Sequence, residues 1–320
     1  MIKSTIKQIF KVDFPFLNPL NRFYKFFLQN QACAIFVLHR VEAYDPERLP
    51  ENEGMKVSPC YLENIIHEYK KQKIRFVSLE ELHTELLSDS GVKEPSVAFT
   101  LDDGYEDNYR VAFPLFTREK VPFTVFLTTD FPERKAVLWW YALEEILLKH
   151  DKIDFLNFSL CTETKRQKSQ AFNILRRHIL SLPEIDLKTF LEKVFEKFDV
   201  DVGFFVEKMA LSWDQIKEMA LSPLCSFGGH SISHRALNSL NQSDLIREIK
   251  DGNRLIEERI GKKIDFFAFP FGTENEFGPR EVDLALETGI KAVFRADGGC
   301  VKKNMDSSKN ALPRVWLKGF

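Results

Sequence analysis

The chain has 320 residues and a mass of 37.3 kDa, with 44% hydrophobic and 29% charged residues, a balance typical of an ordinary globular protein. Its 45 basic and 47 acidic residues give a net charge of −2, so bulk charge gives no reason to expect a nucleic acid as partner. The composition excludes collagen-like, disordered, disulfide-rich and multispan membrane proteins.

The first 31 residues form an amphipathic basic segment. Ile2, Ile6, Ile9 and Phe10 fall on one helical face and lysines on another. The apolar runs are too short for a signal peptide, which needs about 7–15 such residues, or for a membrane span, which needs about 20. Two interpretations stay open: residues 1–30 contact an anionic membrane surface from the cytoplasmic side, or they form a helix that docks on the end of the main domain.

From residue 32 onward, short apolar runs alternate with helical patterns, which is typical of parallel strands joined by crossover helices. The expected strands cover residues 32–38, 74–77, 96–101, 123–127, 225–227, 266–269, 292–294 and 314–317. About seven or eight such units predict one α/β domain over residues 32–320, a distorted (β/α)7-8 barrel whose chemistry lies at the carboxyl ends of the strands.

Capping residues predict where several helices begin. Ser58 precedes Pro59, Ser78 forms a capping box with Glu81, and Ser212 precedes another helical pattern. Ser243 is expected to cap a long helix, which Gly261 would end.

The alternation of strands and helices stops between about residues 149 and 211. Amphipathic stretches at 165–182 and 187–198 follow one another with no strand between them. This predicts a helical insertion of roughly sixty residues, longer than an ordinary connection between a strand and a helix.

The five cysteines, dispersed and without a C-x-x-C pair, indicate a reducing compartment rather than a disulfide framework. We therefore expect a cytoplasmic protein. The cysteines are Cys33, Cys60, Cys161, Cys225 and Cys300.

Two carboxylates, Asp102 and Asp103, follow a predicted strand directly and precede Gly104. Adjacent residues at a strand end point in divergent directions, so one carboxylate can bind a metal while the other acts as a base. The alternative is that the pair caps the following helix, whose solvated first turn we expect at residues 106–108.

Two histidines at i and i+4, His230 and His234, follow another predicted strand and the pair Gly228-Gly229. This spacing places both imidazoles on one face of a helical turn, where they can bind one metal ion. With Asp103 they would form a site of two histidines and one carboxylate, which suits zinc and also iron, cobalt or nickel.

A third motif runs from Phe267 to Gly272. Pro270 fixes a turn at the end of a predicted strand, so the backbone amide of Phe271 could face the site as an oxyanion donor. Taken alone, this motif is explained better as a core strand ending at a turn.

Together these motifs resemble the polysaccharide deacetylase family, carbohydrate esterase family four. Residues 100–104 match its T-F-D-D-G signature with leucine in place of phenylalanine, and residues 230–234 match its H-[ST]-x-x-H metal motif. Residues 269–272 are similar to its aromatic-proline-aromatic-glycine turn.

The resemblance implies a role for each matching residue. Asp102 would be the general base, and Asp103, His230 and His234 would hold one divalent metal ion. We expect zinc, with cobalt, nickel or iron as alternatives. Phe271 would supply a backbone amide to the oxyanion.

The chain departs from the family pattern at two positions. Phe267 stands where the family often has an arginine that tethers the base, and Arg314 is a candidate replacement, or else a surface arginine. No histidine follows His234, whereas the family has a late Leu-x-His motif; His39, at the end of the first strand, is the candidate acid. The position of His39 in the first strand resembles the circularly permuted branch of the family, which includes poly-N-acetylglucosamine deacetylases. The alternative is a hydrogen-bonded histidine under the barrel rim.

Three further residues are candidates for substrate binding. Trp139 and Trp140 follow a loop near the expected barrel mouth, where indole faces stack well on sugar rings. Thr100 could hold the carboxylate pair or contact an acetate group.

These patterns predict a metal-dependent hydrolase that removes an N-acetyl or other N-acyl group from an amino sugar of a glycan or a lipid-linked saccharide. A cytoplasmic location with a basic first segment would favour a lipid-linked sugar at the inner face of the membrane. The alternatives are a non-catalytic carbohydrate-binding relative, or an enzyme that removes a formyl group or opens a cyclic amide with the same site.

Overall fold

The computed structural model describes residues 33–155, 157–182, 187–303, 305–307 and 310–317. The predicted amphipathic segment, residues 1–31, lies outside these residues, so its contact with a membrane stays a prediction. Within the described residues, no helix is long and apolar enough to span a membrane.

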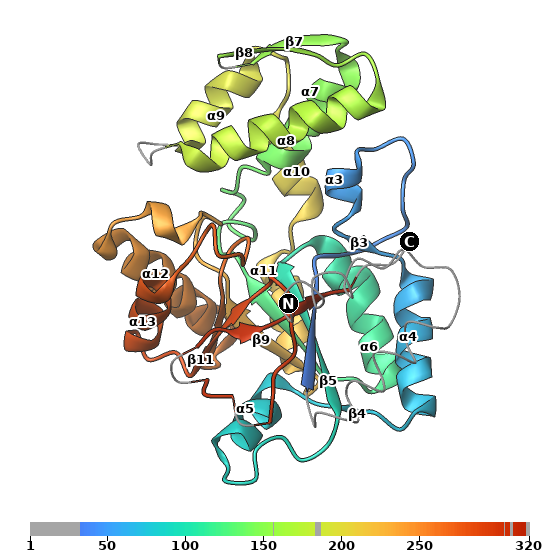
Figure 1. Ribbon diagram of the computed structural model, residues 1–320, viewed down its shortest axis with the longest axis vertical. Coiled ribbons are helices and arrows are strands. Elements are labelled where there is room, and N and C mark those ends of the chain that lie inside the picture. Colours follow the sequence, from blue (N-terminus) through green and yellow to red (C-terminus); the bar gives the residue numbers. More distant parts are fainter. Residues whose placement is uncertain (1–32, 156, 183–186, 304, 308–309, 318–320) are drawn as a thin grey trace, which may run out of the picture.

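Eight parallel strands form the central barrel (Figure 1). In barrel order they are β12 (Leu312–Pro313), β11 (Ala292–Arg295), β10 (Phe266–Ala268), β9 (Cys225–Gly229), β6 (Phe123–Leu127), β5 (Ser96–Asp103), β1 (Cys33–Leu38) and β13 (Val315–Trp316). The prediction of a distorted α/β barrel is confirmed. A short strand, β4 (Arg75–Phe76), pairs with the first residues of β5.

One short segment pairs with both edges of this sheet. Leu312 of β12 is in register with Phe294, and Val315 of β13, three residues later, is in register with Phe36 of β1. Residues 312–316 therefore connect the two edges and bring the barrel close to closure. Arg314 lies between the two short strands and is completely buried.

Helices cover the outside of the barrel and pack on it with their apolar faces. They are α4 (Pro59–Lys71), α5 (Leu79–Leu87), α6 (Phe113–Glu119), α11 (Trp213–Leu221), α12 (Gln242–Ile260) and α13 (Pro279–Glu287). The expected caps at Ser58, Ser78 and Ser212 are confirmed, and Gly261 ends α12 with a left-handed φ of 68°. The expectation for Ser243 is wrong, because Asn241 lies two residues earlier and its side chain accepts the backbone N–H of Asp244.

The insertion forms a separate lobe above the barrel (Figure 1). Its elements are α7 (Trp139–Lys149), β7 (Lys152–Phe155), β8 (Phe158–Cys161), α8 (Lys165–Ser181), α9 (Leu187–Glu196) and α10 (Val202–Met209). The prediction of a purely helical insertion is wrong, since β7 and β8 form an antiparallel hairpin. The lobe also begins earlier than residue 149, because α7 shares its apolar core.

Five short elements complete the fold. β2 (Arg40–Val41) pairs in parallel with β3 (Lys56–Val57), and α3 (Pro50–Glu53) contacts the lobe at α8. A π-helical turn, Asn108–Ala112, leads into α6, and a 3-10 turn covers Leu237–Ser239.

Candidate active site

A sharp turn at the end of β5 separates the two adjacent carboxylates. Asp103 has a left-handed φ of 73° and Gly104 a φ of 97°, and the N–H of Gly104 donates to the carbonyl of Asp102 at 2.9 Å. A Cβ at Gly104 would lie 2.4 Å from the side chain of Leu127, so the turn needs glycine there. As a result, Asp102 faces Arg314 while Asp103 faces the two histidines.

Arg314 binds Asp102 with both terminal nitrogens of its guanidinium. Its two terminal nitrogens donate to the two carboxylate oxygens at 2.6 and 2.7 Å, and one of them also donates to the hydroxyl of Thr100 at 3.0 Å. This planar pairing fixes the orientation of the carboxylate. Arg314 therefore lies against Asp102, where the sequence suggested it.

Burial and neighbouring charges shift the pKa of Asp102, which is only 2% exposed, in opposite directions. Burial alone would raise the pKa of the Asp102 carboxyl, but the charges of Arg314 and His230 hold that pKa below its usual value. Asp102 is thus a carboxylate, ready to accept a proton, at neutral pH.

Asp103, His230 and His234 converge on one point. The Nε2 atoms of the histidines lie 3.4 and 3.1 Å from Oδ1 of Asp103, and candidate ligand atoms of all three residues lie within 4.8 Å of one another. Nδ1 of His230 is 2.7 Å from the carbonyl of Ala268; a carbonyl can only accept, so Nδ1 donates and Nε2 is the nitrogen that faces Asp103 and can serve as a ligand.

This donor set fits a divalent cation. Oδ1 of Asp103 is buried and has no hydrogen-bond partner among the described residues. A divalent cation between this buried carboxylate oxygen and the two Nε2 atoms would compensate the negative charge and use all three atoms as ligands. Two imidazoles and one carboxylate suit zinc or a related transition metal and leave further coordination positions open.

The turn after β10 places a free backbone donor next to His234. Phe271 has a left-handed φ of 62°, and its ring centroid lies 4.7 Å from that of His234. Within the described residues, the N–H of Phe271 has no acceptor. Gly272 lets the turn approach Ala296, because a Cβ at Gly272 would lie 2.7 Å from the Ala296 backbone nitrogen. The amide of Phe271 is thus available to a substrate oxygen.

His39 follows β1 and stacks on the indole of Trp316, with ring centroids 4.6 Å apart. Burial lowers the pKa of His39, although Asp103 and Asp102 act in the opposite direction. Its Nδ1 is buried and has no hydrogen-bond partner among the described residues. The structure therefore places His39 beside the carboxylate pair, with a ring nitrogen available.

Sequence reasoning missed the residues that hold His39 in place. Asp107 and Asn108, expected in a solvated turn, are buried. Asp107 accepts from Nε of Arg40 and from the N–H of Val41, and Asn108 donates to the carbonyl of His39 at 2.9 Å. Their polarity suggested solvent exposure, and no sequence signal links them to partners almost seventy residues away.

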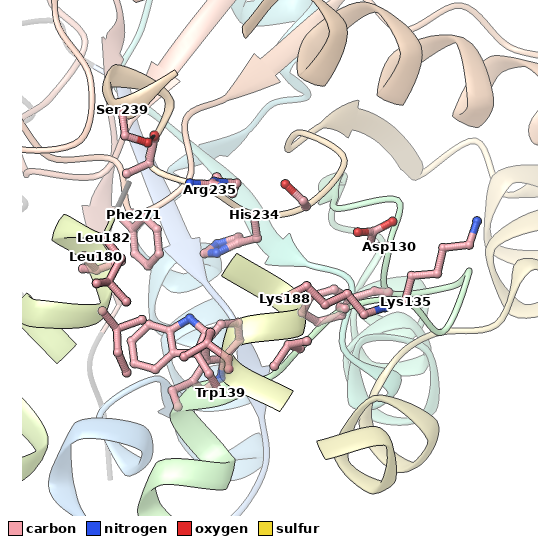
Figure 2. Close-up of a pocket in the computed structure, with 18 residues that line it drawn as sticks. Asp130, Lys135, Trp139, Leu180, Leu182, Lys188, His234, Arg235, Ser239 and Phe271 are labelled. Carbon is pink, nitrogen blue, oxygen red and sulfur yellow. Dashed lines mark hydrogen bonds between the residues drawn. The ribbon is translucent and has the colours of Figure 1, made fainter. Parts of the chain in front are cut away.

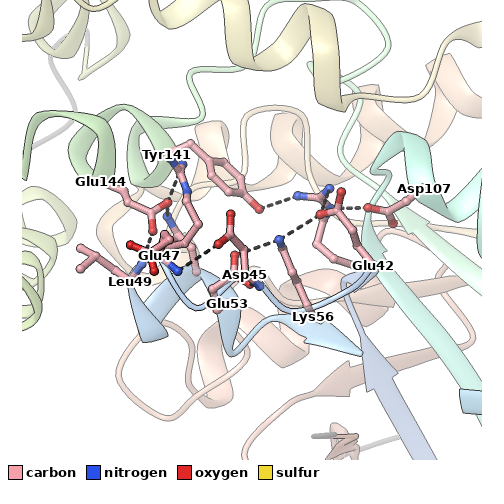
Figure 3. A network of polar contacts seen from close by, with 12 residues as sticks. Glu42, Asp45, Glu47, Leu49, Glu53, Lys56, Asp107, Tyr141 and Glu144 are labelled. Atoms are coloured by element: carbon pink, nitrogen blue, oxygen red, sulfur yellow. Dashed lines mark hydrogen bonds and ion pairs between the residues drawn. The ribbon is translucent and has the colours of Figure 1, made fainter. Parts of the chain in front are cut away.

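Arg40 also joins the barrel to the lobe (Figure 3). Its guanidinium donates to the hydroxyl of Tyr141 in α7 at 3.0 Å and lies 5.0 Å from the ring centroid of Tyr105. A parallel link runs through Trp140, whose indole N–H donates to the Tyr105 hydroxyl at 3.1 Å. Through Tyr105, the lobe is therefore anchored to the turn that directly follows Asp102 and Asp103.

The predicted substrate-binding residues fall into two groups. Trp139 and Trp140, 6% and 8% exposed, line a cavity between lobe and barrel that also borders His234 and Phe271. Thr100 is fully buried, and its hydroxyl donates to the carbonyl of Phe36 while accepting from Arg314. Thr100 thus supports Arg314 and has no exposed surface for substrate.

Comparisons with known proteins agree with this geometry. The family model for polysaccharide deacetylase matches residues 89–153 and 187–293. No curated protein matches the sequence.

Three solved structures are similar over 90% of this chain. The *Streptococcus pyogenes* deacetylase PplD in complex with acetate has a TM-score of 0.59 and 16% identity over 92% of its length. IcaB from *Ammonifex degensii* has a TM-score of 0.56 and 18% identity over 92% of its length. The BpsB deacetylase domain from *Bordetella bronchiseptica* has a TM-score of 0.56 and 14% identity over 96% of its length.

At these identities the likeness concerns the fold, while the family model covers more than half of the chain. The circular permutation that we expected stays a prediction. The chain belongs to the polysaccharide deacetylase family.

Proposed function

We propose that this protein removes an N-acetyl or other N-acyl group from an amino sugar of a saccharide, with the help of one divalent metal ion. The observation that carries the proposal is that two adjacent carboxylates have different partners. Asp102 is held by Arg314 and stays free of the metal cluster, while Asp103 joins His230 and His234.

Asp103, His230 and His234 would hold the metal. When bound there, a divalent cation would act as a Lewis acid that polarises the amide carbonyl and lowers the pKa of water. We expect zinc, with cobalt, nickel or iron as alternatives.

The remaining steps belong to residues of the chain. Asp102 accepts a proton from the attacking water, and Arg314 keeps its carboxylate ionised and aimed. The N–H of Phe271 donates to the oxygen that becomes negative, a contribution worth about 3–4 kcal/mol in comparable sites. His39, stacked on Trp316, delivers a proton to the departing amine, and the proton that Asp102 accepted from water replaces it.

The substrate class follows from the family and not from the site geometry. Family membership supports a saccharide substrate. A lipid-linked sugar at the inner face of the membrane also belongs to the proposal and depends on residues 1–30. The cytoplasmic location belongs to it as well and depends on the five dispersed cysteines.

The experiment measures acetate released from an N-acetylated chito-oligosaccharide by the full chain loaded with zinc. We expect release by the wild type and a loss of at least about 100-fold in Asp102→Asn, which keeps the shape of the side chain and removes the base. Asp154→Asn, an exposed position in the β7–β8 hairpin, is the matched control.

Equal activity of Asp102→Asn and wild type would contradict the proposed mechanism. Binding of the oligosaccharide without release of any acid by the wild type would favour the non-catalytic alternative. Mass spectrometry of the product separates deacetylation from deformylation and from opening of a cyclic amide.

A further inference from the structure

A cavity of about 280 Å³ lies between the barrel mouth and the lobe (Figure 2). His234 and Phe271 form part of its wall, so it is continuous with the site described above. Trp139, Leu180 and Leu191 contribute its lobe side, from α7, α8 and α9. A saccharide bound at His234 would therefore extend into this cavity.

The walls of the cavity are divided by polarity. In Figure 2, Phe271, Leu180, Leu182 and Trp139 gather at one end, and Asp130, Lys135 and Lys188 at the other, with His234 between the two groups. Apolar surface of this kind packs on the carbon faces of sugar rings. The charged side chains at the polar end determine whether the cavity favours a positive or a negative group on the saccharide.

Among the lining residues that the structure describes, two lysines, Lys135 and Lys188, lie with Asp130 at the polar end. The ammonium of Lys135 contacts Glu133 at 3.3 Å, and that of Lys188 contacts Glu192 at 3.9 Å. Both lysines are largely exposed, and pairs of this kind are weak. Each ammonium has three donors, so both can still bind an anion.

The charges of Lys135 and Lys188 both lower the pKa of the Asp130 carboxyl. Burial raises the pKa of Asp130 to about 6, Glu248 acts in the same direction, and the two lysines oppose it. Two cations from separate elements, the loop after β6 and helix α9, therefore share one region of the cavity.

We propose that this cavity is a substrate-binding subsite for a negatively charged group, phosphoryl or carboxylate, carried by the saccharide next to the amino sugar that reacts. The inference rests on the proposed function, because it places the reacting sugar at His234. The two lysines would attract the anion, and the apolar end would pack on the carbon skeleton.

The first test compares three substrates of similar size: neutral N,N′-diacetylchitobiose, its 1-phosphate, and a disaccharide of N-acetylglucosamine and a uronic acid. We expect kcat/KM to be at least about tenfold higher for an anionic substrate at low salt, and the preference to shrink as salt screens the charges. The phosphate and uronate arms identify which source of the anion the subsite selects.

The second test uses Lys188→Gln and the double variant Lys135→Gln/Lys188→Gln. The ratio of kcat/KM for the anionic and neutral substrates should fall toward one, mainly through KM. Lys193→Gln, an exposed position on the same helix and outside the cavity, should keep the wild-type ratio. Equal use of neutral and anionic substrates by the wild type would overturn the inference, as would an unchanged ratio in the double variant.

Binding to the Asp102→Asn variant, measured by titration calorimetry, separates this inference from the proposed function. Tighter binding of the anionic disaccharides without turnover by the wild type would support the subsite and contradict the proposed function. Equal affinities for all three compounds, with normal turnover of the neutral one, would contradict the subsite alone.

Discussion

Around the barrel mouth, polar side chains are buried and held by partners, whereas the lobe above it is held by apolar packing. The mouth contains Asp102 and Arg314, both almost completely buried, and backbone with left-handed φ at Asp103, Ser231, His234 and Phe271. The lobe packs α7, α8, α9 and the hairpin around side chains such as Phe172 and Phe195.

The difference indicates a division of roles. Strained backbone and buried charges are costly, and they persist where the surrounding barrel fixes reacting groups. Outside its anchoring contacts at Trp140 and Tyr141, an apolar lobe can carry different side chains at its rim without disturbing those groups. We infer that the mouth determines the chemistry and that the lobe, through the cavity beneath it, influences which saccharide is bound.

The largest effect is expected from the ion pair at the mouth. Arg314→Gln removes the charge that orients and ionises Asp102, so kcat/KM should fall by about 100-fold or more, mainly in kcat. Arg314→Lys should recover little, because one ammonium cannot replace the planar pairing. Steady-state kinetics check this, and circular dichroism verifies folding. Near-normal kcat in folded Arg314→Gln would show that the tether is dispensable.

A similar effect is expected from the candidate acid. His39→Gln should lower kcat by about 100-fold on an unactivated amide, since general acid catalysis contributes factors of that order. A substrate with a good leaving group should be affected much less, because it needs no proton. The control is His67→Gln, an exposed histidine on α4. Equal losses on both substrates would contradict the role of His39 as acid.

The link between mouth and lobe predicts a smaller effect on rate. Asp107→Asn leaves Arg40 without its buried carboxylate and loosens the segment that carries His39, so kcat should fall by about tenfold, with a lower Tm. Tyr141→Phe removes only the lobe's hydroxyl contact with Arg40 and should change kcat less. Thermal melts and kinetics of both variants test this order, and the reverse order would contradict it.

The smallest expected effect concerns Asp130, which lines the cavity between the lobe and the barrel. Its pKa is raised to about 6 in the folded protein, so the ionised carboxylate destabilises the fold above that pH, and the penalty disappears as pH falls toward the unfolded pKa. Asp130→Asn should therefore raise Tm by a few degrees at pH 8 and by nearly nothing at pH 4. A constant difference in Tm across this range would show that the ionisation has no such cost.

The two regions also differ in how far the sequence predicts them. The strand β6 and the motifs at the ends of β5, β9 and β10 could be predicted because buried strands are continuous apolar runs followed by short polar signals. The hairpin in the lobe was missed because each strand has only four residues, so the alternation of Lys152–Phe155 between exposed and buried side chains is a short signal between two helical patterns.

Long-range pairing explains what could not be predicted at the mouth. Residues 312–316, which close the barrel, divide into two strands of two residues each. β12 pairs with β11 at one edge of the sheet, and β13 pairs with β1 at the other edge. Asp107 has the sequence signature of a surface residue, and only the fold brings Arg40 against it. Arg314 could be proposed because its strand was predicted, but its bidentate contact with Asp102 depends on closure of the barrel.

The most direct test of the account is a titration of metal-free protein with zinc by calorimetry, in the wild type and in Asp103→Asn. The account predicts one ion per chain for the wild type and affinity reduced by at least about 100-fold in the variant, because a neutral amide replaces the only charged ligand. Absence of binding by the wild type, or equal affinity in both proteins, would contradict the claim that Asp103, His230 and His234 form a metal site.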